Sequence, residues 1–135
     1  MQAYLVRRAS GQIPNRLPLE CRARRIHRMG RIGGRREWTA AHFAIEGEPI
    51  ESAHEYHSKD GRASGVWICS PGRILEEEHA EDEFCTIIGG RVGLIDNATG
   101  KEEVFVTGDS FFLPKGSNLT WVVYETVSKF YFTAE

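Results

Sequence analysis

Short runs of β-branched and aromatic residues alternate with turn residues along the chain after Trp38. Such runs at close spacing are typical of strands, and no long stretch past residue 40 keeps a helical period. The runs that we interpret as strands are HFAIE (42–46), SGVWICS (64–70), RILEEEH (73–79), EFCTIIG (83–89), RVGLIDN (91–97), EEVFV (102–106), SFFL (110–113), LTWVVY (119–124) and SKFYFT (128–133).

Turn residues fill the segments between these runs. They are PG at 71–72, GG at 89–90, NATG at 97–100, GD at 108–109 and PKG at 114–116. Because such short connections leave no room for crossover helices, the strands are expected to run antiparallel. The sequence therefore predicts an all-β protein, an antiparallel sandwich or small barrel. We expect SAHEYHSKDG, with His54 and His57, to form an exposed loop, and we expect His42 to have no partner.

One segment, EEEHAEDEFCTIIGG, places many acidic residues before an apolar run. Alternate residues of a strand share one face. This parity separates Glu76 and Glu78, which we interpret as facing outwards, from Glu77 and His79. If the next strand folds back beside them, its inward residue Glu83 joins the second pair. One imidazole and two carboxylates then meet inside the protein.

This trio permits three interpretations. Two carboxylates and one imidazole suit manganese or iron better than a structural zinc site, because the donor set is richer in oxygen. Without a metal, Glu77 and Glu83 repel each other, which raises one carboxyl pKa and creates an acid–base pair. In the plainest interpretation, the acidic residues are solvated charges at a strand end. We therefore expect Mn or Fe, otherwise Zn, with the metal-free alternatives left open.

Composition limits the class of protein. The 135 residues fit one domain. No apolar run of about 18 residues is present, so a transmembrane helix is not expected. The start MQAYLVRRAS lacks the apolar core of a signal peptide. Three cysteines without CxxC spacing indicate neither a disulfide framework nor a zinc knuckle. We therefore expect a cytoplasmic protein.

The first 36 residues differ sharply in charge from the rest, since they hold ten arginines and a single acid. One interpretation is that this segment contacts the phosphates of nucleic acid, but it has no recognisable binding motif. A transit peptide and an upstream extension before Met29 are others. The plainest is a flexible arm or an edge strand that lies across a partner subunit.

Two segments resemble the sequence motifs of the cupin superfamily. The first motif, Gly-x5-His-x-His-x3/4-Glu-x6-Gly, aligns with Glu83 at its glutamate, His79 at its second histidine and Glu77 at its first. The second, Gly-x5-Pro-x-Gly-x2-His-x3-Asn, matches GDSFFLPKGSNLTWVV, in which Leu119 stands at the histidine position. The resemblance implies an antiparallel jelly-roll barrel with a pocket at one mouth.

More narrowly, several segments are similar to small cupins of the (S)-ureidoglycine aminohydrolase type. They are DGRASGVW, CSPG, DEFCTIIGGRV, GDSFFLPKG and SKFYF. In that type, a Glu-x-His-x3-His set and a glutamine hold manganese, and Glu77 and His79 match the start of the set. Glu83 stands at the next histidine and Leu119 at the glutamine. The resemblance also implies a homodimer. We divide the chain into a basic arm at 1–36 and a single cupin barrel at 37–135.

Two tryptophans extend the predicted pocket. Trp121 shares strand parity with Leu119, a position that faces the pocket in the family pattern, and Trp67 could line the same cavity. Aromatic walls with a few polar groups are typical of small-ligand pockets, so we expect these three residues to contact a ligand. The alternative is that the tryptophans belong to the barrel core. We interpret Cys85 as a core residue, because no basic side chain near it in sequence lowers its thiol pKa.

These features lead to one principal hypothesis and two alternatives. The principal hypothesis is a cupin that binds a small polar metabolite, with Glu77, His79 and Glu83 as metal ligands or proton-transfer groups. Aminohydrolase, lyase or isomerase chemistry would fit such a site. A non-catalytic sensor or structural cupin without metal is the first alternative. A nucleic-acid-associated protein that uses the basic arm is the second.

Overall fold

The computed structural model describes residues 4–7 and 37–135, and every regular element in this part is a strand. The strands are β1 (Tyr4–Arg7), β2 (Thr39–Ala40), β3 (Ala44–Glu46), β4 (Ile50–Lys59), β5 (Arg62–Cys69), β6 (Gly72–Glu76), β7 (Asp82–Asp96), β8 (Glu102–Val106), β9 (Ser110–Leu113) and β10 (Leu119–Ala134). Among these residues, no helix is long and apolar enough to cross a membrane.

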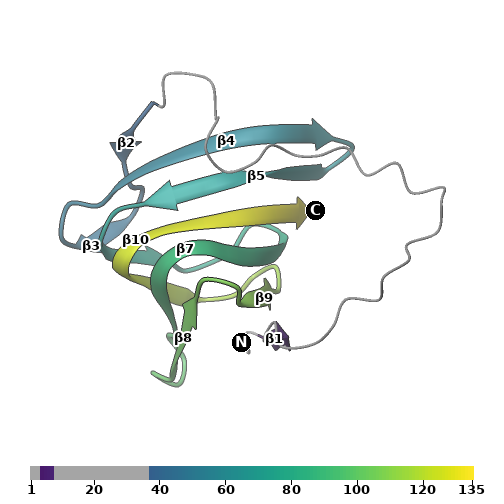
Figure 1. Cartoon of the computed structure of the whole chain (residues 1–135). Helices are drawn as coiled ribbons and strands as arrows, with labels where there is room; N and C mark the ends of the chain where they lie inside the picture. The colour runs from purple at the N-terminus through teal and green to yellow at the C-terminus, as the bar shows by residue number, and fades with distance from the viewer. Residues whose placement is uncertain (1–3, 8–36) are drawn as a thin grey trace.

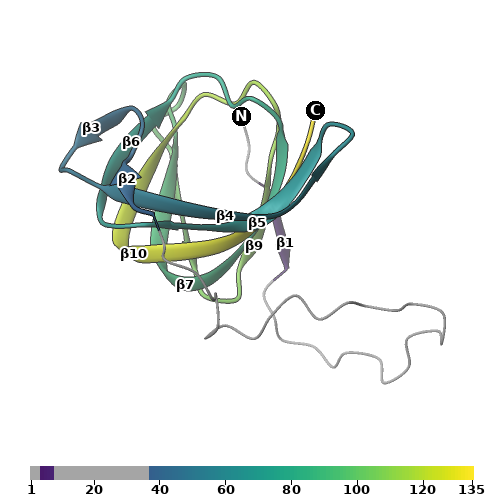
Figure 2. The same cartoon turned by 90° about the horizontal axis from the view of Figure 1, so that it is seen from above.

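All strand pairs are antiparallel, which agrees with the predicted absence of crossover helices. The main order is β1-β9-β7-β10-β5-β4-β2, with β3, β6 and β8 paired outside this path. Figure 1 shows β4, β5, β10 and β7 side by side across the molecule. Seen from above in Figure 2, the sheet curls round an interior space. The all-β, antiparallel barrel architecture is confirmed.

Strand β10 organises this curled sheet. Its first half, from Leu119, pairs with β6 and with the end of β7, and its second half pairs with β5 and with the start of β7. Leu119, Trp121 and Val123, which alternate along β10, belong to the hydrophobic core. Because one strand contributes to both halves of the barrel, residues near its two ends reach the same interior space.

The GG pair at 89–90 is not the turn that the sequence predicts. Strand β7 runs through it without a break, so the two predicted strands are one. Gly90 has a φ of 80°, and a Cβ there would collide with the Thr126 carbonyl oxygen of β10. The register of the β7–β10 pair is irregular opposite this site. The glycines therefore allow a bulge where two long strands bend, as glycine does at barrel corners.

A second correction concerns SAHEYHSKDG, which forms most of β4 and the turn to β5 instead of a loop. The turn lies at Asp60 and Gly61, both with positive φ. His54 and His57 are exposed on β4, as expected. The predicted turns NATG, GD and PKG are confirmed. Of the predicted arm at 1–36, the described part is β1, at one edge of the sheet, and residues 8–36 lie outside the described residues.

Candidate functional site

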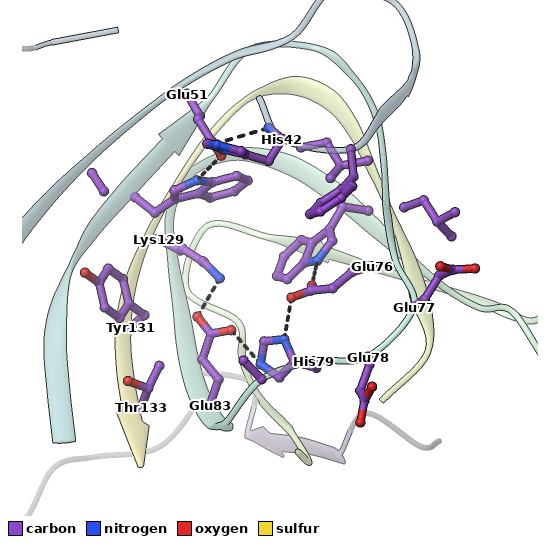
Figure 3. Close-up of a pocket in the computed structure, with 17 residues that line it drawn as sticks. His42, Glu51, Glu76, Glu77, Glu78, His79, Glu83, Lys129, Tyr131 and Thr133 are labelled. Carbon is purple, nitrogen blue, oxygen red and sulfur yellow. Dashed lines mark hydrogen bonds and ion pairs between the residues drawn. The ribbon is translucent and has the colours of Figure 1, made fainter. Parts of the chain in front are cut away.

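A pocket of about 630 Å³ opens at one end of the curled sheet. Its walls come from β4, β5, β6, β10, the first residues of β7 and the loops around 42–43 and 77–80. Figure 3 shows the labelled polar side chains gathered round this space. The pocket is enclosed by segments far apart in the sequence, which is typical of ligand sites at barrel mouths.

The loop between β6 and β7 carries His79, and the backbone of His79 is held on both sides. Its N–H donates to the Ser117 carbonyl at 2.9 Å, and its carbonyl accepts from the Gly116 N–H at 2.7 Å. Asp82, at the start of β7, accepts from the Lys115 N–H at 2.8 Å. The turn after β9 therefore fixes the loop, and the side chain of His79 is only 9% exposed.

Five side chains form a continuous chain of contacts across the pocket floor. The Trp121 indole N–H donates to Glu76 Oε2 at 2.7 Å, and Glu76 Oε1 lies 2.7 Å from His79 Nδ1. His79 Nε2 lies 3.1 Å from Glu83 Oε2, and Lys129 Nζ donates to Glu83 Oε1 at 2.6 Å. Charges alternate along the chain, so each ion has a partner of opposite sign. We call these five residues the inner chain.

The His79–Glu83 contact differs from the others in geometry. The two atoms are 3.1 Å apart, but the Nε2–H does not point at the carboxylate oxygen, and Nε2 makes no hydrogen bond. The contact is therefore an attraction between charges rather than an aligned hydrogen bond. The Nε2 atom is itself buried, and Glu83 is its ion-pair partner.

Lys129 places its ammonium group deep in the pocket wall. The residue is 5% exposed, and it lies directly opposite Trp67 in the β10–β5 register. Its Nζ stands 4.3 Å from the centre of the Trp121 ring and 5.1 Å from that of Trp67. Glu83 neutralises the ammonium, and the two indole faces stabilise it further by cation–π attraction.

Electrostatics keeps the inner chain ionised. Burial alone would lower the pKa of His79, but its contacts with Glu76 and Glu83 raise it to about 9. Burial alone would raise the pKa of Glu83, but the Lys129 ammonium and the imidazole lower it to about 2. The pKa of Glu76 also falls, because the His79 and Trp121 hydrogen bonds outweigh burial. Near neutral pH, His79 is therefore an imidazolium between two carboxylates.

A second set of the same three residue types lies nearer the surface. The Trp67 indole N–H donates to Glu51 Oε2 at 2.9 Å, and Glu51 Oε1 lies 3.0 Å from His42 Nδ1. We call these residues the outer triad, and the matching residues Trp121, Glu76 and His79 the inner triad. The His42 side chain is 80% exposed. The expectation that His42 has no partner is wrong, because β4 brings Glu51 beside it.

The predicted trio is brought together only in part. His79 and Glu83 meet, but Glu77 is exposed on the pocket rim, and Figure 3 shows it turned away from that pair. The cause is local, since β6 ends at Glu76 and the chain bends at 77–78, so strand parity does not extend to His79. Glu76, predicted to face outwards, takes the place expected for Glu77 beside His79.

The predicted ligand-contact residues are also divided. Trp67 and Trp121 both line the pocket, with ring centres 5.7 Å apart. Leu119 does not line it, because it is fully buried in the core and pairs with the end of β6. Cys85 is buried in the core as expected, and burial raises the pKa of its thiol.

Sequence reasoning missed Lys129, Glu76 and Glu51, and only Lys129 left a signal. Ile74 shares parity with Glu76, but Leu75 on the opposite face is apolar too, so parity did not show which face of β6 is the inner one. Lys129 lies two residues after the buried Val127, which marked an inward position for a lysine. Glu51 had no such signal, because β4 was not predicted as a strand.

The residues present do not fit the predicted metal site. Both oxygens of Glu83 and of Glu76 already face donors, and a cationic ammonium stands 2.6 Å from Glu83. A metal ligand must offer a free lone pair, whereas a protonated imidazole has none. Within the described part of the chain, no group of three or more His, Cys, Asp or Glu side chains is arranged to hold a metal ion.

An antiparallel sheet that curls round a pocket lined by inward side chains is the architecture of a cupin. The chain belongs to the family of EutQ-like cupin domains, whose family model matches residues 57–131. This assignment confirms the superfamily and the jelly-roll class expected from the sequence. No curated protein matches the chain.

Solved structures support the fold. The chain is similar to the EutQ protein of Clostridium difficile, with a TM-score of 0.58 and 18% identity over 64% of this chain and 68% of that one. It is similar to a Pseudomonas syringae protein of unknown function from the DUF861 family, with a TM-score of 0.64 and 24% identity over 73% of this chain and 44% of that one. It is also similar to the polyketide cyclase RemF from Streptomyces resistomycificus, with a TM-score of 0.60 and 15% identity over 83% and 79%.

Proposed function

We propose that this cupin binds a small polar organic molecule in its pocket and does so without a metal ion. The observation that carries the proposal is the Lys129 ammonium, which lies 2.6 Å from Glu83 and over both indole rings. Lys129 places a fixed positive charge next to Glu83, the carboxylate that would have to bind a metal ion. A divalent cation placed there would meet strong repulsion from Lys129 and from the His79 imidazolium.

The walls of the pocket suit an organic ligand. The Trp67 and Trp121 rings lie at a tilt with their centres 5.7 Å apart, and their N–H groups are held by carboxylates, so both rings have fixed orientations. Glu76 is partly exposed to the pocket, and its carboxylate has acceptor capacity beyond the two donors that it already meets. Apolar walls with a few fixed polar groups are the usual composition of a small-ligand site.

A second candidate function is metal-free proton transfer of the lyase or isomerase type. His79 favours it, because this imidazolium belongs to a residue that lines the pocket and lies between two carboxylates. For exchange at carbon, the partly exposed Glu76 carboxylate would accept the carbon-bound proton, and the imidazolium would donate a proton to the negative charge that develops. Glu83 would then stabilise the imidazolium, and Lys129 would hold Glu83 in place.

Metal content and ligand location test the main proposal together. Protein equilibrated with Mn²⁺ or Fe²⁺ and then desalted is expected to retain far less than one ion per chain by elemental analysis. In ¹⁵N NMR spectra, paramagnetic Mn²⁺ should leave the indole N–H signals of Trp67 and Trp121 unbroadened, and a small organic ligand should shift them. Stoichiometric metal that broadens both signals and is lost in Glu83→Gln would overturn the metal-free site.

The proton-transfer candidate needs a separate experiment. Each ligand found by NMR is incubated in D₂O, and exchange of its carbon-bound protons is followed in time. The wild-type protein should accelerate exchange, and His79→Gln should bind the ligand yet lose the acceleration. If His79→Gln is as active as the wild type, His79 is not the acid.

Two finer expectations from sequence stay predictions. The ureidoglycine aminohydrolase type requires a metal set that the pocket does not fit, so hydrolysis of ureidoglycine by the metal-free protein would be an unexpected result. The homodimer predicted from the cupin resemblance is tested by sedimentation velocity on the full chain.

A further inference from the structure

The outer face of the curled sheet carries a regular patch of uncharged side chains. Residues that alternate with the pocket-lining and core positions of β9, β7, β10 and β5 face away from the interior space round which the sheet curls (Figure 2). The strand register arranges eight of them in two rows. One row is Phe112, Phe84, Phe132 and Ser64, and the other is Ser110, Thr86, Phe130 and Val66. We call these eight residues the outer patch.

The outer patch leaves aromatic rings accessible and has no charge to bury. Phe84 is 39% exposed and Phe132 is 45% exposed, whereas Phe111, on the opposite side of β9, is fully buried. Two of the hydroxyl groups in the patch, those of Thr86 and Ser110, already bond to each other at 2.8 Å. Covering the patch would therefore bury apolar area without stranding an ion. Accessible aromatic rings on neighbouring strands are typical of a contact surface.

The charges beside the outer patch match those of a second copy of the chain. The next row of the sheet runs from Asp82 on β7 through Ala134 on β10 to Arg62 on β5, and both charged residues are exposed. An acid and a base thus stand one strand away from β10 on opposite sides. A two-fold axis that runs along β10, between two facing copies, exchanges these sides. It brings Asp82 opposite Arg62 of the partner subunit, twice in the dimer.

The same axis suits the shapes of the outer patch. Phe130 and Phe132 lie on β10, so each meets the same residue of the second copy near the axis. Phe84 on β7 meets Ser64 of the partner subunit on β5, which places a large side chain opposite a small one. A surface that packs against its own copy must not bring like charges together, and the uncharged centre of the patch meets this condition.

We infer that the outer patch is the face through which two copies of this chain form a two-fold dimer, with the axis along β10. The two sheets face each other with their strands roughly aligned. The contact is small, so we expect a dissociation constant on the order of 10 µM. The inference is independent of ligand binding, because none of the eight residues lines the pocket.

Sedimentation velocity of the full chain, from well below to well above this concentration, measures the dimer. Phe132→Asp would bring two carboxylates together at the axis in an apolar contact, and it should weaken dimerisation at least about hundredfold. Val104→Asp is the matched control, because Val104 is a similarly exposed apolar residue on β8, outside the outer patch. It should leave the dissociation constant within about twofold of the wild type.

The position of the axis is tested by charge and by direct contact. Arg62→Glu places a carboxylate opposite Asp82 of the partner subunit at two points, and it should weaken the dimer about tenfold, with a larger effect at low salt. Lys101→Glu changes the net charge equally at a residue outside the outer patch, and it should have less than about a twofold effect. In a mixture of ¹³C-labelled and unlabelled wild-type chains, isotope-filtered NOEs should connect the Phe132 rings of two copies.

The possible failures are distinct. A chain that stays monomeric at every concentration overturns the inference, whether the patch faces solvent or NOEs within one chain show that residues 8–36 cover it. If Val104→Asp removes the dimer and Phe132→Asp does not, the dimer uses another face. If Arg62→Glu leaves the dissociation constant unchanged, the axis along β10 is wrong. If Phe132→Asp unfolds the chain, as circular dichroism would show, the wild-type NOEs decide, and their absence in the dimer overturns the inference.

Discussion

The inner and outer triads use the same three side chains in the same contact order, and they differ in depth. In each, a tryptophan N–H donates to one oxygen of a glutamate and a histidine Nδ1 lies at the other oxygen. The His79 side chain is 9% exposed, whereas the His42 side chain is 80% exposed. The inner glutamate and imidazole continue into Glu83 and Lys129, and the outer triad ends in solvent.

Burial, rather than residue type, therefore decides how much such a contact contributes to stability. Water competes for the His42–Glu51 contact of the outer triad, so this contact contributes little to stability and the His42 imidazole is available to a ligand. His79, Glu83 and Lys129 have lost nearly all of their water and depend on one another, so removing one of them leaves its neighbour with an uncompensated charge. We therefore expect the inner chain to be rigid and the outer triad to be able to rearrange.

The largest expected effect comes from breaking the inner chain at Lys129. Lys129→Met leaves Glu83 buried without its ammonium partner and should lower the free energy of unfolding by about 3–5 kcal/mol. Urea unfolding followed by fluorescence measures it. Lys101→Met, at a lysine whose partner Glu103 lies 3.6 Å away near the surface, should stay within about 0.5 kcal/mol of the wild type.

A double variant shows whether the loss at Lys129 reflects the stranded charge. Lys129→Met/Glu83→Met replaces both ions by apolar side chains, and it should recover much of the lost stability. A single variant that loses less than about 1 kcal/mol, or a double variant worse than the single one, would contradict the account of the inner chain as a set of interdependent ions.

The second effect is the pH dependence that the inner chain gives to stability. The pKa of His79 is raised from 6.5 to about 9, so the stability from its protonated form is fully present below pH 6.5 and is lost as pH rises through about 9. The difference between wild type and His79→Gln should therefore shrink between about pH 6 and pH 9.5, by on the order of 2–3 kcal/mol. His42→Gln is the control at the rim, and it should stay within about 0.5 kcal/mol throughout. A His79→Gln difference that is constant with pH would contradict the ion chain.

Lowering the pH also removes stability from the inner chain, in this case through Glu83. The pKa of Glu83 is lowered from 4.5 to about 2, so its stabilising contribution is present above pH 4.5 and is lost as pH falls through about 2. The inner chain therefore contributes most to stability between pH 4.5 and pH 6.5, the pKa values of Glu83 and His79 in the unfolded chain. Unfolding measured below pH 4 in wild type and in Glu83→Gln should show the two stabilities converging.

Sequence parity predicted the fold and part of the site because its rules hold where strands run unbroken. Along β7, Glu83, Cys85 and Ile87 alternate inwards as expected, since no bend interrupts them. The rule failed at Glu77, because β6 stops at Glu76 and a bend resets the direction of the side chains. It failed again at the GG pair, where a glycine that commonly marks a turn forms a bulge.

Parity gave only a weak signal for Lys129. A lysine is rarely buried unless it has a partner, so an inward parity alone does not predict a buried one. Its partner Glu83 lies 46 residues earlier, and only the antiparallel pairing of β7 with β10 brings the two together. A family pattern of metal ligands cannot reveal such a substitution, because the lysine occupies none of the motif positions.

The third prediction concerns Glu76, the carboxylate of the inner triad. Glu76→Gln replaces two acceptor oxygens by one oxygen and an amide, so either Trp121 or His79 loses its acceptor. The expected loss is about 1–3 kcal/mol, because the stranded donor stays buried. In ¹⁵N spectra, the Trp121 indole signal or the His79 Nδ1 signal should move strongly. If neither signal moves and the stability is unaltered, water has replaced the carboxylate oxygen, and the inner chain is not closed to solvent.

The smallest effect belongs to the same substitution in the outer triad. Glu51→Gln also removes one acceptor oxygen, but His42 is exposed and can turn to water, so the expected loss is about 0.2–1 kcal/mol. The loss should fall further as salt is raised, since exposed charges are screened, whereas the loss in Glu76→Gln should change little. Unfolding of both variants in low and high salt gives the four values needed. If Glu51→Gln costs as much as Glu76→Gln and is equally insensitive to salt, depth does not distinguish the two triads, and the rim is as much a part of the rigid structure as the floor.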